Sequence, residues 1–385
     1  MHEKNNGRIK VLQINAGSKD YGGVSAMVFG IYKNIDKEKF QFDFVSPRKT
    51  TYEIKRREIE EMGGNIIELD TKGNLIRRKI QLYFRLKKII EKERYQIVHI
   101  NSGSFFFNLQ VAIISKKLNV KKIIIHSHNG KNPNKKVKNI FIKIFKPLIK
   151  VYGTDFLTCS NEASENMYTK KMIQNNEIIM IPNGIETDKF KYNEDVRNRY
   201  RNKLNIDGKI VLGNIGRFKE QKNHKFLLEV FKELLKINSN FVLLLIGEGE
   251  LKQKIEDYTE ELKISENVLF LGLREDISEL LMCMDIFIMT SIHEGLPVVG
   301  IEAQASGLPL VLSDCITKEI NVSNNIKYIS LSESPTNWAI EINKIAIKEN
   351  NREESYKNVK EKGFDIKETV KKIEKIYLSK NENIS

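Results

Sequence analysis

The chain has 385 residues, of which 41% are apolar and 30% charged, with only 7 Pro and 22 Gly. This composition excludes a collagen-like or wholly disordered chain and is typical of a globular protein of two or three domains. The formal net charge of +14 favours polyanionic partners such as nucleic acid, anionic lipid or phosphorylated substrates.

The positive charge is confined to the first half of the chain. Residues 1–190 contain 35 Lys and Arg against 19 Asp and Glu, a balance of +16, whereas the remainder has a balance of −2. Such asymmetry indicates two units with different partners.

The cysteines and the N-terminus bear on the compartment. Cys159, Cys283 and Cys315 are far apart and form no CxxC pair, which argues against a disulfide framework or structural zinc and fits a reducing cytoplasm. The segment Met1–Lys10 is polar, and no apolar run approaches the ~20 residues of a membrane span. We expect a cytoplasmic protein that is peripherally associated with the inner face of the cell membrane.

Short apolar runs alternate with longer segments of helical period along the chain. The runs are rich in Ile, Val, Leu and Phe and are apolar on both faces, which is typical of buried parallel strands. This alternation predicts a doubly wound α/β architecture. The predicted strands are Lys10–Asn15, Phe42–Val45, Ile97–Asn101, Lys122–His126, Asp155–Cys159, Ile178–Ile181, Ile210–Asn214, Phe241–Ile246, Val268–Leu271, Ile286–Met289 and Leu310–Ser313.

A polar stretch between Phe190 and Lys209 interrupts the alternation, and a new strand follows it. We therefore predict two Rossmann-like domains, residues 1–190 and residues 191–365, facing each other across a cleft. An amphipathic helix at about residues 366–385 is expected to pack back on the first domain.

The most specific pattern is Ser291–Gly307 (SIHEGLPVVGIEAQASG), which follows a predicted strand. A glycine turn leads into a helix whose first position suits Pro297, with Glu294 on the loop and Glu302 about one and a half turns into the helix. The free N–H groups at such a helix start form an anion site. A buried carboxylate one to two turns in can accept hydrogen bonds from a ribose diol. This context favours a nucleotide site over a loop acid beside a solvated helical acid.

A second pattern, Gly213–Asn223 (GNIGRFKEQKN), follows the first strand of the second domain. Ligands of open α/β sheets bind at the carboxyl ends of the strands. Arg217 and Lys222 on this loop are therefore placed to clamp a diphosphate. Asn223 is expected to cap the next helix, and His224 to be structural.

Near the N-terminus, Gly22 and Gly23 precede a predicted helix. Two glycines allow a ligand to approach the backbone closely, although a plain tight turn explains the pair as well. The spacing is not GxGxxG, and the acidic residue that a dinucleotide ribose needs is missing, which argues against NAD binding.

His126 and His128 lie where the strand Lys122–His126 ends. Imidazole is suited to contact a sugar hydroxyl or to transfer protons near neutral pH, and a structural strand-end histidine is the alternative. No Asp or Glu lies near them in the sequence, and the chain has no DxD carboxylate pair. We therefore expect neither a metal nor another cofactor.

The segment Lys131–Lys150 predicts a basic amphipathic helix without acidic residues. We expect its apolar stripe to pack on its own domain and its lysines to attract anionic lipid, with insertion of the stripe into a membrane as the alternative. A second basic stretch, Arg77–Lys88, adds to the positive field. The stripe consists of Val137, Ile140, Phe141, Ile144, Phe145 and Leu148.

Together these motifs resemble glycosyltransferase family 4, whose members are retaining, GT-B-fold transferases of bacterial polysaccharide assembly. The variant is similar to transferases of capsule and exopolysaccharide clusters, which extend lipid-linked sugars. The resemblance implies an acceptor-binding first domain and a second domain that binds a nucleotide-sugar donor. The matching segments span nearly the whole chain in order: YGGVSAMV, IHSHN, CSNEA, IPNGIETDKF, GRFKEQKN, IGEGE, FLG and EGLPVVGIEAQASGLPLV.

The resemblance also implies roles for the matching positions of the second domain. Arg217 and Lys222 would bind the donor diphosphate and stabilise the leaving phosphate. Glu302 would bind the ribose, and Glu294 would contact the donor sugar. Further positions implied to line the donor are Gly22, Gly23, Leu273, Gly295, Leu296, Pro297, Val298 and Val299.

In the first domain the resemblance places a histidine near the reaction centre. The alignment of strand ends favours His128, with His126 second, and both His126 and Asn129 would contact the acceptor or sugar. The HSHN spacing leaves the choice between the two histidines open.

We therefore expect a metal-independent glycosyltransferase that uses a nucleotide-sugar donor, such as a UDP-sugar, and a lipid-linked or oligosaccharide acceptor, with retention of configuration. The alternative among enzymes is a nucleotide-sugar epimerase of the same fold. The alternative outside enzymes is a basic nucleic-acid-binding protein. We expect no nucleic-acid partner, because the aromatic residues of the basic half have core-like helical spacing and no RNA-binding signature is present.

Overall fold

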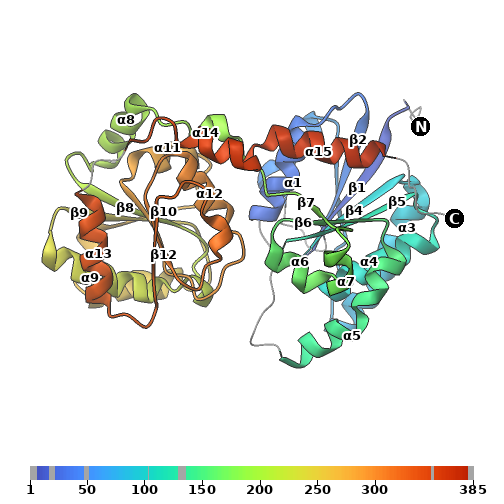
Figure 1. The fold of residues 1–385 in the computed structure, drawn as a ribbon, viewed down its shortest axis with the longest axis horizontal. Helices are drawn as coiled ribbons and strands as arrows, with labels where there is room; N and C mark the ends of the chain where they lie inside the picture. The colour runs from blue at the N-terminus through green and yellow to red at the C-terminus, as the bar shows by residue number, and fades with distance from the viewer. Residues whose placement is uncertain are drawn as a thin grey trace. The chain divides into compact units, whose positions relative to one another are not determined.

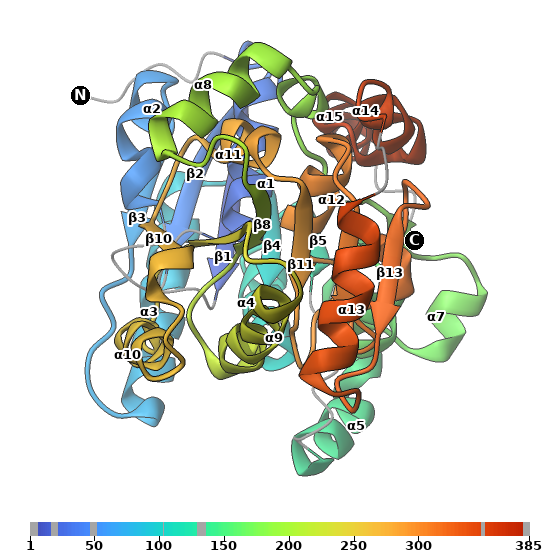
Figure 2. The ribbon, with the colours of Figure 1, turned by 90° about the vertical axis from the view of Figure 1, so that its left-hand side faces the viewer.

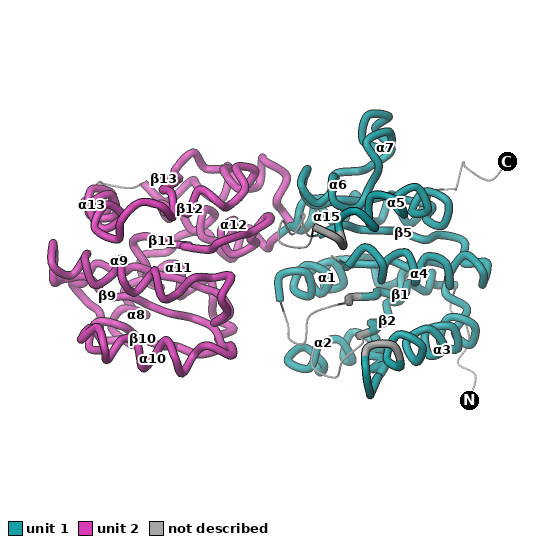
Figure 3. Tube along the Cα trace, turned by 90° about the horizontal axis from the view of Figure 1, so that it is seen from below, with its two compact units in different colours: residues 1–184, 366–385 teal, residues 185–365 magenta. Residues whose placement is uncertain are grey.

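The computed structural model describes residues 7–16, 22–46, 52–102, 104–128, 136–347 and 351–379. The chain divides into two compact units (Figure 3), of which unit 1 comprises residues 1–184 and 366–385 and unit 2 comprises residues 185–365. The division thus falls a few residues before the boundary expected at residue 190. The segment from residue 366 onward belongs to unit 1.

Unit 1 contains a seven-stranded sheet in the order β3-β2-β1-β4-β5-β6-β7, and all neighbouring strands are parallel. The chain adds β2 and β3 on one side of β1 and then crosses over for β4, so the sheet is doubly wound. The strands are β1 (Ile9–Ala16), β2 (Phe40–Ser46), β3 (Asn65–Glu68), β4 (Ile97–Ser102), β5 (Lys122–Ser127), β6 (Asp155–Thr158) and β7 (Ile179–Met180).

Helices cover both faces of this sheet (Figure 1). Helices α1 and α15 pack together on one face, and α3, α4 and α5 pack in succession on the other. Successive strand residues point to opposite layers and form two separate apolar cores. The helices are α1 (Gly23–Asn34), α2 (Arg56–Glu61), α3 (Leu75–Glu93), α4 (Phe105–Lys117), α5 (Lys136–Tyr152), α6 (Asn161–Met167), α7 (Lys170–Gln174) and α15 (Ile366–Leu378).

Unit 2 contains a six-stranded parallel sheet in the order β10-β9-β8-β11-β12-β13. Helices α9, α10 and α13 cover one face, and α8, α11, α12 and α14 cover the other (Figure 2). The strands are β8 (Ile210–Ile215), β9 (Phe241–Ile246), β10 (Val268–Gly272), β11 (Ile286–Met289), β12 (Leu310–Ser313) and β13 (Ile326–Ile329). The helices are α8 (Glu194–Leu204), α9 (His224–Ile237), α10 (Lys252–Glu261), α11 (Ile277–Cys283), α12 (Val298–Ala305), α13 (Pro335–Ala346) and α14 (Ser355–Val359).

The prediction of a doubly wound α/β fold is confirmed in both units, and each predicted strand is present. The sequence pattern does not predict β3 and β13. Both lie at a sheet edge, and their side chains are mostly half-buried or exposed. They therefore lack the continuous apolar run that marks a strand buried on both faces.

Helix α5 only partly meets the expectation that its apolar stripe packs on its own domain, since Leu148 packs on the core and Phe145 contacts Phe106 of α4. Ile140, Phe141 and Ile144 keep 62%, 51% and 64% of their surface exposed, whereas Ile142 and Ile149 are buried. The buried positions lie seven residues apart, on a face rotated by roughly 100° from the stripe. Periodicity reveals that α5 has an apolar stripe but not which face its neighbour covers. Within the described ranges, every helix is too short or too polar to span a bilayer.

Backbone hydrogen bonds join the loops that follow β8, β9 and β10. The N–H of Gly216 donates to the carbonyl of Ile246 at 2.9 Å, and the N–H of Gly247 donates to the carbonyl of Gly272 at 2.9 Å. Gly247 has a φ of +140°, and a Cβ there would overlap the carbonyl oxygen of Gly216. The absence of a side chain therefore permits the close approach that fixes the loop carrying Arg217.

Replacing Gly247 by Ala should destabilise unit 2 by about 2–4 kcal/mol, because the added methyl overlaps backbone and the residue keeps an unfavourable φ. Urea unfolding can be followed by the fluorescence of Trp338, the single Trp of the chain, which is buried in unit 2. The control Gly208→Ala also has a positive φ, +69°, but no atom within 4 Å of the new Cβ, and should cost about 1 kcal/mol. Equal losses in both variants would contradict the packing argument.

Candidate functional site

Most predicted site residues of unit 2 come from the loops that follow two neighbouring strands, β8 and β11, and from the helix α12 after the second loop. β8 and β11 pair directly, yet β9 and β10 extend the sheet on one side and β12 and β13 on the other. The helices that follow β8 and β11 pack on opposite faces of the sheet. Their loops diverge at this switch point, which is where doubly wound sheets bind ligands.

An ion pair joins the two loops. Lys222, in the short turn Glu220–Lys222 after β8, contacts the Oε1 atom of Glu294 in the loop after β11. The Oγ of Ser291 donates to the same carboxylate oxygen at 3.1 Å. Only 18% of the Lys222 side chain and 12% of the Glu294 side chain are exposed, so solvent screens this pair less than a surface pair. The structure thus brings together a cation and a carboxylate that two separate motifs predict.

Further hydrogen bonds hold these loops in register. The Oγ1 of Thr290 lies 3.3 Å from the carbonyl oxygen of Lys222 and 3.1 Å from that of Asn223, and donates to them. The Nε2 of Gln221 donates to the carbonyl of His293 at 2.6 Å. Asn223 precedes α9 in a left-handed conformation with φ of 55° and forms no side-chain cap. Asn223 is thus the N-cap residue of α9, as expected, but its left-handed backbone places it in a tight turn and its side chain does not cap the helix.

Glu302 lies in α12, behind the loop that carries Glu294. Its carboxylate forms no hydrogen bond or ion pair with any residue that the structure describes. Burial raises the pKa of Glu302 to about 7. A carboxylate that is partly buried without a partner costs stability. The position therefore points to a ligand that supplies hydrogen-bond donors.

The other predicted positions of unit 2 lie on the loops after β8, β10 and β11 and at the start of α12. Arg217 is half-buried on the loop after β8, and Leu273, directly after β10, keeps 76% of its surface exposed. Pro297 is the N-cap of α12 and not its first residue, a shift of one position from the prediction. Gly295 and Leu296 form the loop before it, and Val298 and Val299 begin the helix.

His224, at the start of α9, is buried and stacks on Phe218 with 4.5 Å between ring centroids. Burial, together with the nearby charge of Lys222, lowers the pKa of His224 to about 4. A neutral, stacked imidazole is what a structural role requires.

In unit 1, Gly22 is the N-cap of α1 and Gly23 is its first residue. Gly22 has extended backbone with φ of −146°, a conformation open to any residue. The helix start is thus where the sequence predicts it, and the role of the glycines in binding stays a prediction. Residues 17–21 and Asn129 lie outside the described residues.

His126 and His128 belong to a cluster of three buried histidines. Their ring centroids are 4.1 Å apart. His99 lies on the neighbouring strand β4, and its Nε2 is 3.3 Å from the Nδ1 of His126. The Nε2 of His128 lies 3.2 Å from the amide oxygen of Asn101, and its Nδ1 lies 3.2 Å from that of Asn183.

The cluster is uncharged at neutral pH. Burial lowers the pKa of His99 to about 3 and that of His128 to about 4, and it lowers the pKa of His126 well below the usual range. His128 keeps 6% of its surface exposed, whereas the other two are fully buried. This difference favours His128 over His126 as the histidine that a ligand reaches.

Sequence reasoning does not single out His99, Asn101 or Tyr377 of α15, which contacts His99. The first two stand at alternate positions of the strand sequence IVHINS, and polar residues on one face of a buried strand are a signal that could have found them. Tyr377 is separated from His99 by 278 positions, and its sequence reads as part of an amphipathic helix. No local pattern links the two.

The described residues contain no group of three His, Cys, Asp or Glu side chains placed to hold a metal ion. The histidine cluster does not form one, because the facing nitrogens of His99 and His126 are within hydrogen-bonding distance of each other.

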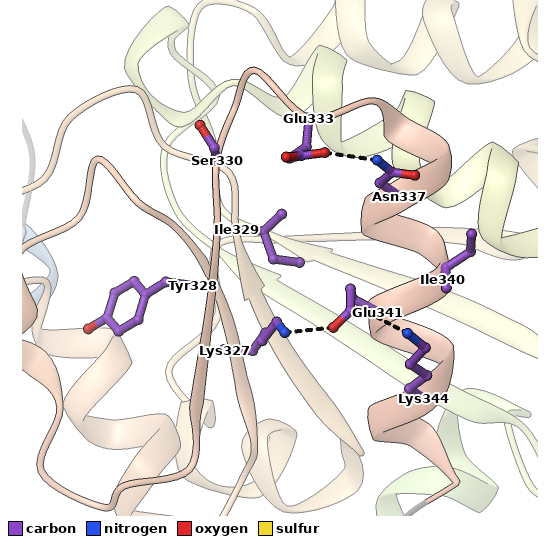
Figure 4. Close-up of a pocket in the computed structure, with 9 residues that line it drawn as sticks. All are labelled: Lys327, Tyr328, Ile329, Ser330, Glu333, Asn337, Ile340, Glu341 and Lys344. Carbon is purple, nitrogen blue, oxygen red and sulfur yellow. Dashed lines mark hydrogen bonds and ion pairs between the residues drawn. The ribbon is translucent and has the colours of Figure 1, made fainter.

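A pocket of about 430 Å³ lies elsewhere in unit 2, between the edge strand β13 and helix α13 (Figure 4). Glu341 forms ion pairs of 2.7 Å with Lys327 and with Lys344 there, and these lysines lower the pKa of the Glu341 carboxyl to about 2. The two lysines of the pocket are thus paired with Glu341, and none of the predicted site residues lines it.

Two family models match the chain and together span most of it. The one described as "Glycosyltransferase Family 4" matches residues 21–189, and the one described as "Glycosyl transferases group 1" matches residues 196–363. The chain belongs to glycosyltransferase family 4. The resemblance that the motifs indicate is thereby confirmed.

Relatives of this glycosyltransferase align over most of its length. It is 29% identical over 381 residues to the glycosyltransferase EpsF of Bacillus subtilis (strain 168), with 97% of each chain covered. It is 27% identical over 380 residues to the capsular polysaccharide biosynthesis glycosyltransferase CapH of Staphylococcus aureus, with 97% of this chain and 99% of that protein covered. It is 27% identical over 252 residues, 62% of each chain, to the UDP-Gal:alpha-D-GlcNAc-diphosphoundecaprenol alpha-1,3-galactosyltransferase of Escherichia coli.

The fold also matches solved structures. The crystal structure of Anabaena Alr3699/HepE in complex with UDP and glucose superposes with a TM-score of 0.78 at 16% identity, over 97% of this chain and 100% of that chain. The GT-B fold is confirmed. The comparisons support a glycosyltransferase of polysaccharide biosynthesis over the two alternatives, an epimerase and a nucleic-acid-binding protein.

The raised pKa of Glu302 predicts a stability that depends on pH. The folded enzyme holds this proton more tightly than the unfolded chain, so the carboxyl destabilises the fold increasingly as the pH rises from about 4.5 through about 7. Glu302→Gln should therefore stabilise unit 2 by about 3 kcal/mol at pH 8 and by less than about 1 kcal/mol at pH 5. Urea unfolding read by Trp338 fluorescence at both pH values measures the difference. The exposed Glu266→Gln control should show no such dependence, and a uniform effect of Glu302→Gln would refute the assignment.

Proposed function

We propose that this enzyme transfers a sugar from a UDP-sugar to a lipid-linked or oligosaccharide acceptor, with retention of the anomeric configuration and without a metal ion. The observation that carries the donor assignment is the unpartnered Glu302 carboxylate, which lies in α12, the helix that follows the loop of the Lys222–Glu294 pair. A carboxylate can accept hydrogen bonds from a ribose diol, and a cation and a helix N-terminus can bind a diphosphate.

The donor is assigned to groups of unit 2. The Glu302 carboxylate accepts hydrogen bonds from the ribose hydroxyls, which would relieve the cost of its burial. Arg217 and Lys222 bind the diphosphate oxygens, and the first N–H groups of α12 at Val298 and Val299 add donors. The exposed Leu273 is assigned to the nucleotide base. The solved relative of this fold that holds UDP and glucose supports a uridine nucleotide.

Glu294 and Lys222 stabilise charges of opposite sign that develop in the reaction. As the bond from the anomeric carbon to the leaving phosphate breaks, the sugar becomes positive and the phosphate negative. Glu294 stabilises the sugar, while Lys222 and Arg217 stabilise the phosphate. The acceptor oxygen attacks from the same face, and its proton passes to the departing phosphate oxygen. Configuration is thereby retained, as the family resemblance implies.

No metal is needed in this scheme because the protein itself supplies the cations. Lys222 and Arg217 occupy the loop that would face the diphosphate, and the sequence has no DxD pair to hold a divalent ion there. The glycines at the start of α1 are assigned to the phosphates. His128 is assigned to a hydroxyl of the transferred sugar, with His126 behind it.

The acceptor assignment draws on helix α5. Ile140, Phe141 and Ile144 form an exposed apolar row, and the exposed Lys143 lies within it. Exposed aromatic and aliphatic side chains beside lysine are the pattern of a helix that lies in the interface of an anionic membrane. The Escherichia coli relative acts on a diphosphoundecaprenol-linked sugar, which supports a lipid-linked acceptor presented at such a surface.

Nucleotide binding tests the donor assignment. In calorimetry, UDP should bind equally well with and without EDTA, and more tightly than GDP or ADP. Glu302→Gln and Lys222→Met should each weaken UDP binding about tenfold or more, because each removes a charged partner. Glu266→Gln, an exposed carboxylate, is the matched control. Absence of binding by all three nucleotides, or a strict need for a metal, would contradict the proposal.

Vesicle sedimentation tests the membrane assignment. The enzyme should bind anionic vesicles at low salt better than neutral ones, and replacing Ile140, Phe141 and Ile144 by Ser should weaken that binding at least about tenfold through lost apolar burial. The control replaces Ile54 and Ile347 by Ser. These two isoleucines are exposed to a similar degree but lie outside α5. Equal binding to neutral and anionic vesicles, or an equal loss in the control, would count against an α5 membrane contact.

A further inference from the structure

The buried hydroxyl of Tyr377 on α15 is the meeting point of two hydrogen-bonded arms in unit 1. It lies 2.7 Å from the Nδ1 of His99 and accepts a hydrogen bond of 2.8 Å from the Nε2 of Gln13. Both arms lead to His128. One runs through His99 to His126, whose ring lies against that of His128. The other runs through Gln13 to Asn101, whose amide oxygen faces the Nε2 of His128.

The donors along the Gln13 arm fix its direction. The Nδ2 of Asn101 donates to the Oε1 of Gln13 at 2.8 Å, and Gln13 uses its own Nε2 to donate to Tyr377. Asn101 therefore turns its acceptor oxygen toward His128. A neutral imidazole can satisfy that oxygen only by carrying its proton on Nε2.

The His99 arm has a direction as well. Because the Tyr377 oxygen accepts from Gln13, its own hydrogen is free to be donated to the Nδ1 of His99. His99 then carries its proton on Nε2 and donates it to the Nδ1 of His126. The low pKa values that burial gives His99 and His128 agree with neutral rings throughout.

We propose that Tyr377 is a positioning residue that holds His128 in the Nε2-protonated form, so that the Nδ1 lone pair accepts a hydrogen bond from a sugar hydroxyl. In the structure, Nδ1 lies 3.2 Å from the amide oxygen of Asn183, so the proposed form requires this amide to exchange its oxygen for its NH₂ group. The Asn183 amide forms no other hydrogen bond with the described residues that would fix its orientation. That amide can rotate to donate to Nδ1 or give way to a ligand. His128 thus donates its Nε2 proton to Asn101 and presents Nδ1 as an acceptor. The consequence for turnover rests on the proposed function, whereas the protonation pattern does not.

Tyr377 is well suited to a test because its hydroxyl and its ring have separate roles. The ring packs against Phe40 and Phe42, with centroid separations of 5.5 and 6.1 Å, and Tyr377→Phe keeps that packing. The matched control is Tyr95→Phe, since Tyr95 is buried in the same unit and donates to Asp43 at 2.6 Å. The control removes an equally buried hydroxyl that has no contact with the histidines.

The first measurement is the protonation site of His128. Two-dimensional ¹H–¹⁵N NMR of histidine-labelled enzyme without substrate distinguishes the two neutral forms. The chain has only six histidines, so the His128 signals can be assigned as those that disappear in His128→Gln. The unmodified enzyme and Tyr95→Phe should show only the Nε2-protonated form, and Tyr377→Phe a mixture of both. Gln13→Met, which cuts only one arm, should also give a mixture. Unchanged spectra in both Tyr377→Phe and Gln13→Met would overturn the proposal.

The second measurement separates positioning from packing. Tyr377→Phe should lower kcat about tenfold and leave the KM for the donor within about twofold, while Tyr95→Phe leaves both unchanged. A mixed protonation pattern with unchanged kcat would overturn the positioning role. If no donor is turned over by the unmodified enzyme, the proposed function fails, but the NMR result still decides whether Tyr377 sets the protonation of His128.

Discussion

The contact between Lys222 and Glu294 is the constraint on which the candidate site of unit 2 depends. It joins loops that follow two paired strands but lead to helices on opposite faces of the sheet. The ion pair adds to the hydrogen bonds from Thr290 and Gln221 that hold the two diverging loops at a fixed separation. The pair is mostly buried, so breaking it by removing one partner would leave an uncompensated charge. The same two side chains can therefore order the site and act on the substrate.

The two units differ in how they handle buried polar groups. Unit 2 leaves one carboxylate, Glu302, without a partner and keeps two opposite charges close together. Around its histidine cluster, unit 1 instead buries a neutral network in which Tyr377 contacts His99 directly and Asn101 through Gln13. A site with unpaired or closely paired charges is suited to a charged ligand, whereas a neutral hydrogen-bonded network is suited to fix the orientation of a single group.

The sequence predicts what depends on local pattern. The buried strands, the loop that carries Glu294 and the turn that carries Lys222 all follow from short runs of residues whose burial or turn chemistry is self-contained. The edge strands β3 and β13 escape prediction because their side chains are partly solvated. Part of the α5 stripe is misassigned because the rest of unit 1 covers a face that only overlaps it. His99 and Tyr377 are missed because the contact between them spans most of the chain. Each failure concerns a choice that only tertiary packing makes.

Helix α15 follows unit 2 in the chain but completes the core of unit 1, where it packs on α1 and supplies Tyr377 to the histidine network. Synthesis on the ribosome therefore releases the segments in an order that the fold does not match. Residues 185–365 are contiguous, so unit 2 can close as soon as they emerge. Unit 1 must wait, with one face of its sheet only partly covered by α1, until α15 appears, and its histidines lack their tyrosine until then. The first unit to be made is thus the last to be finished.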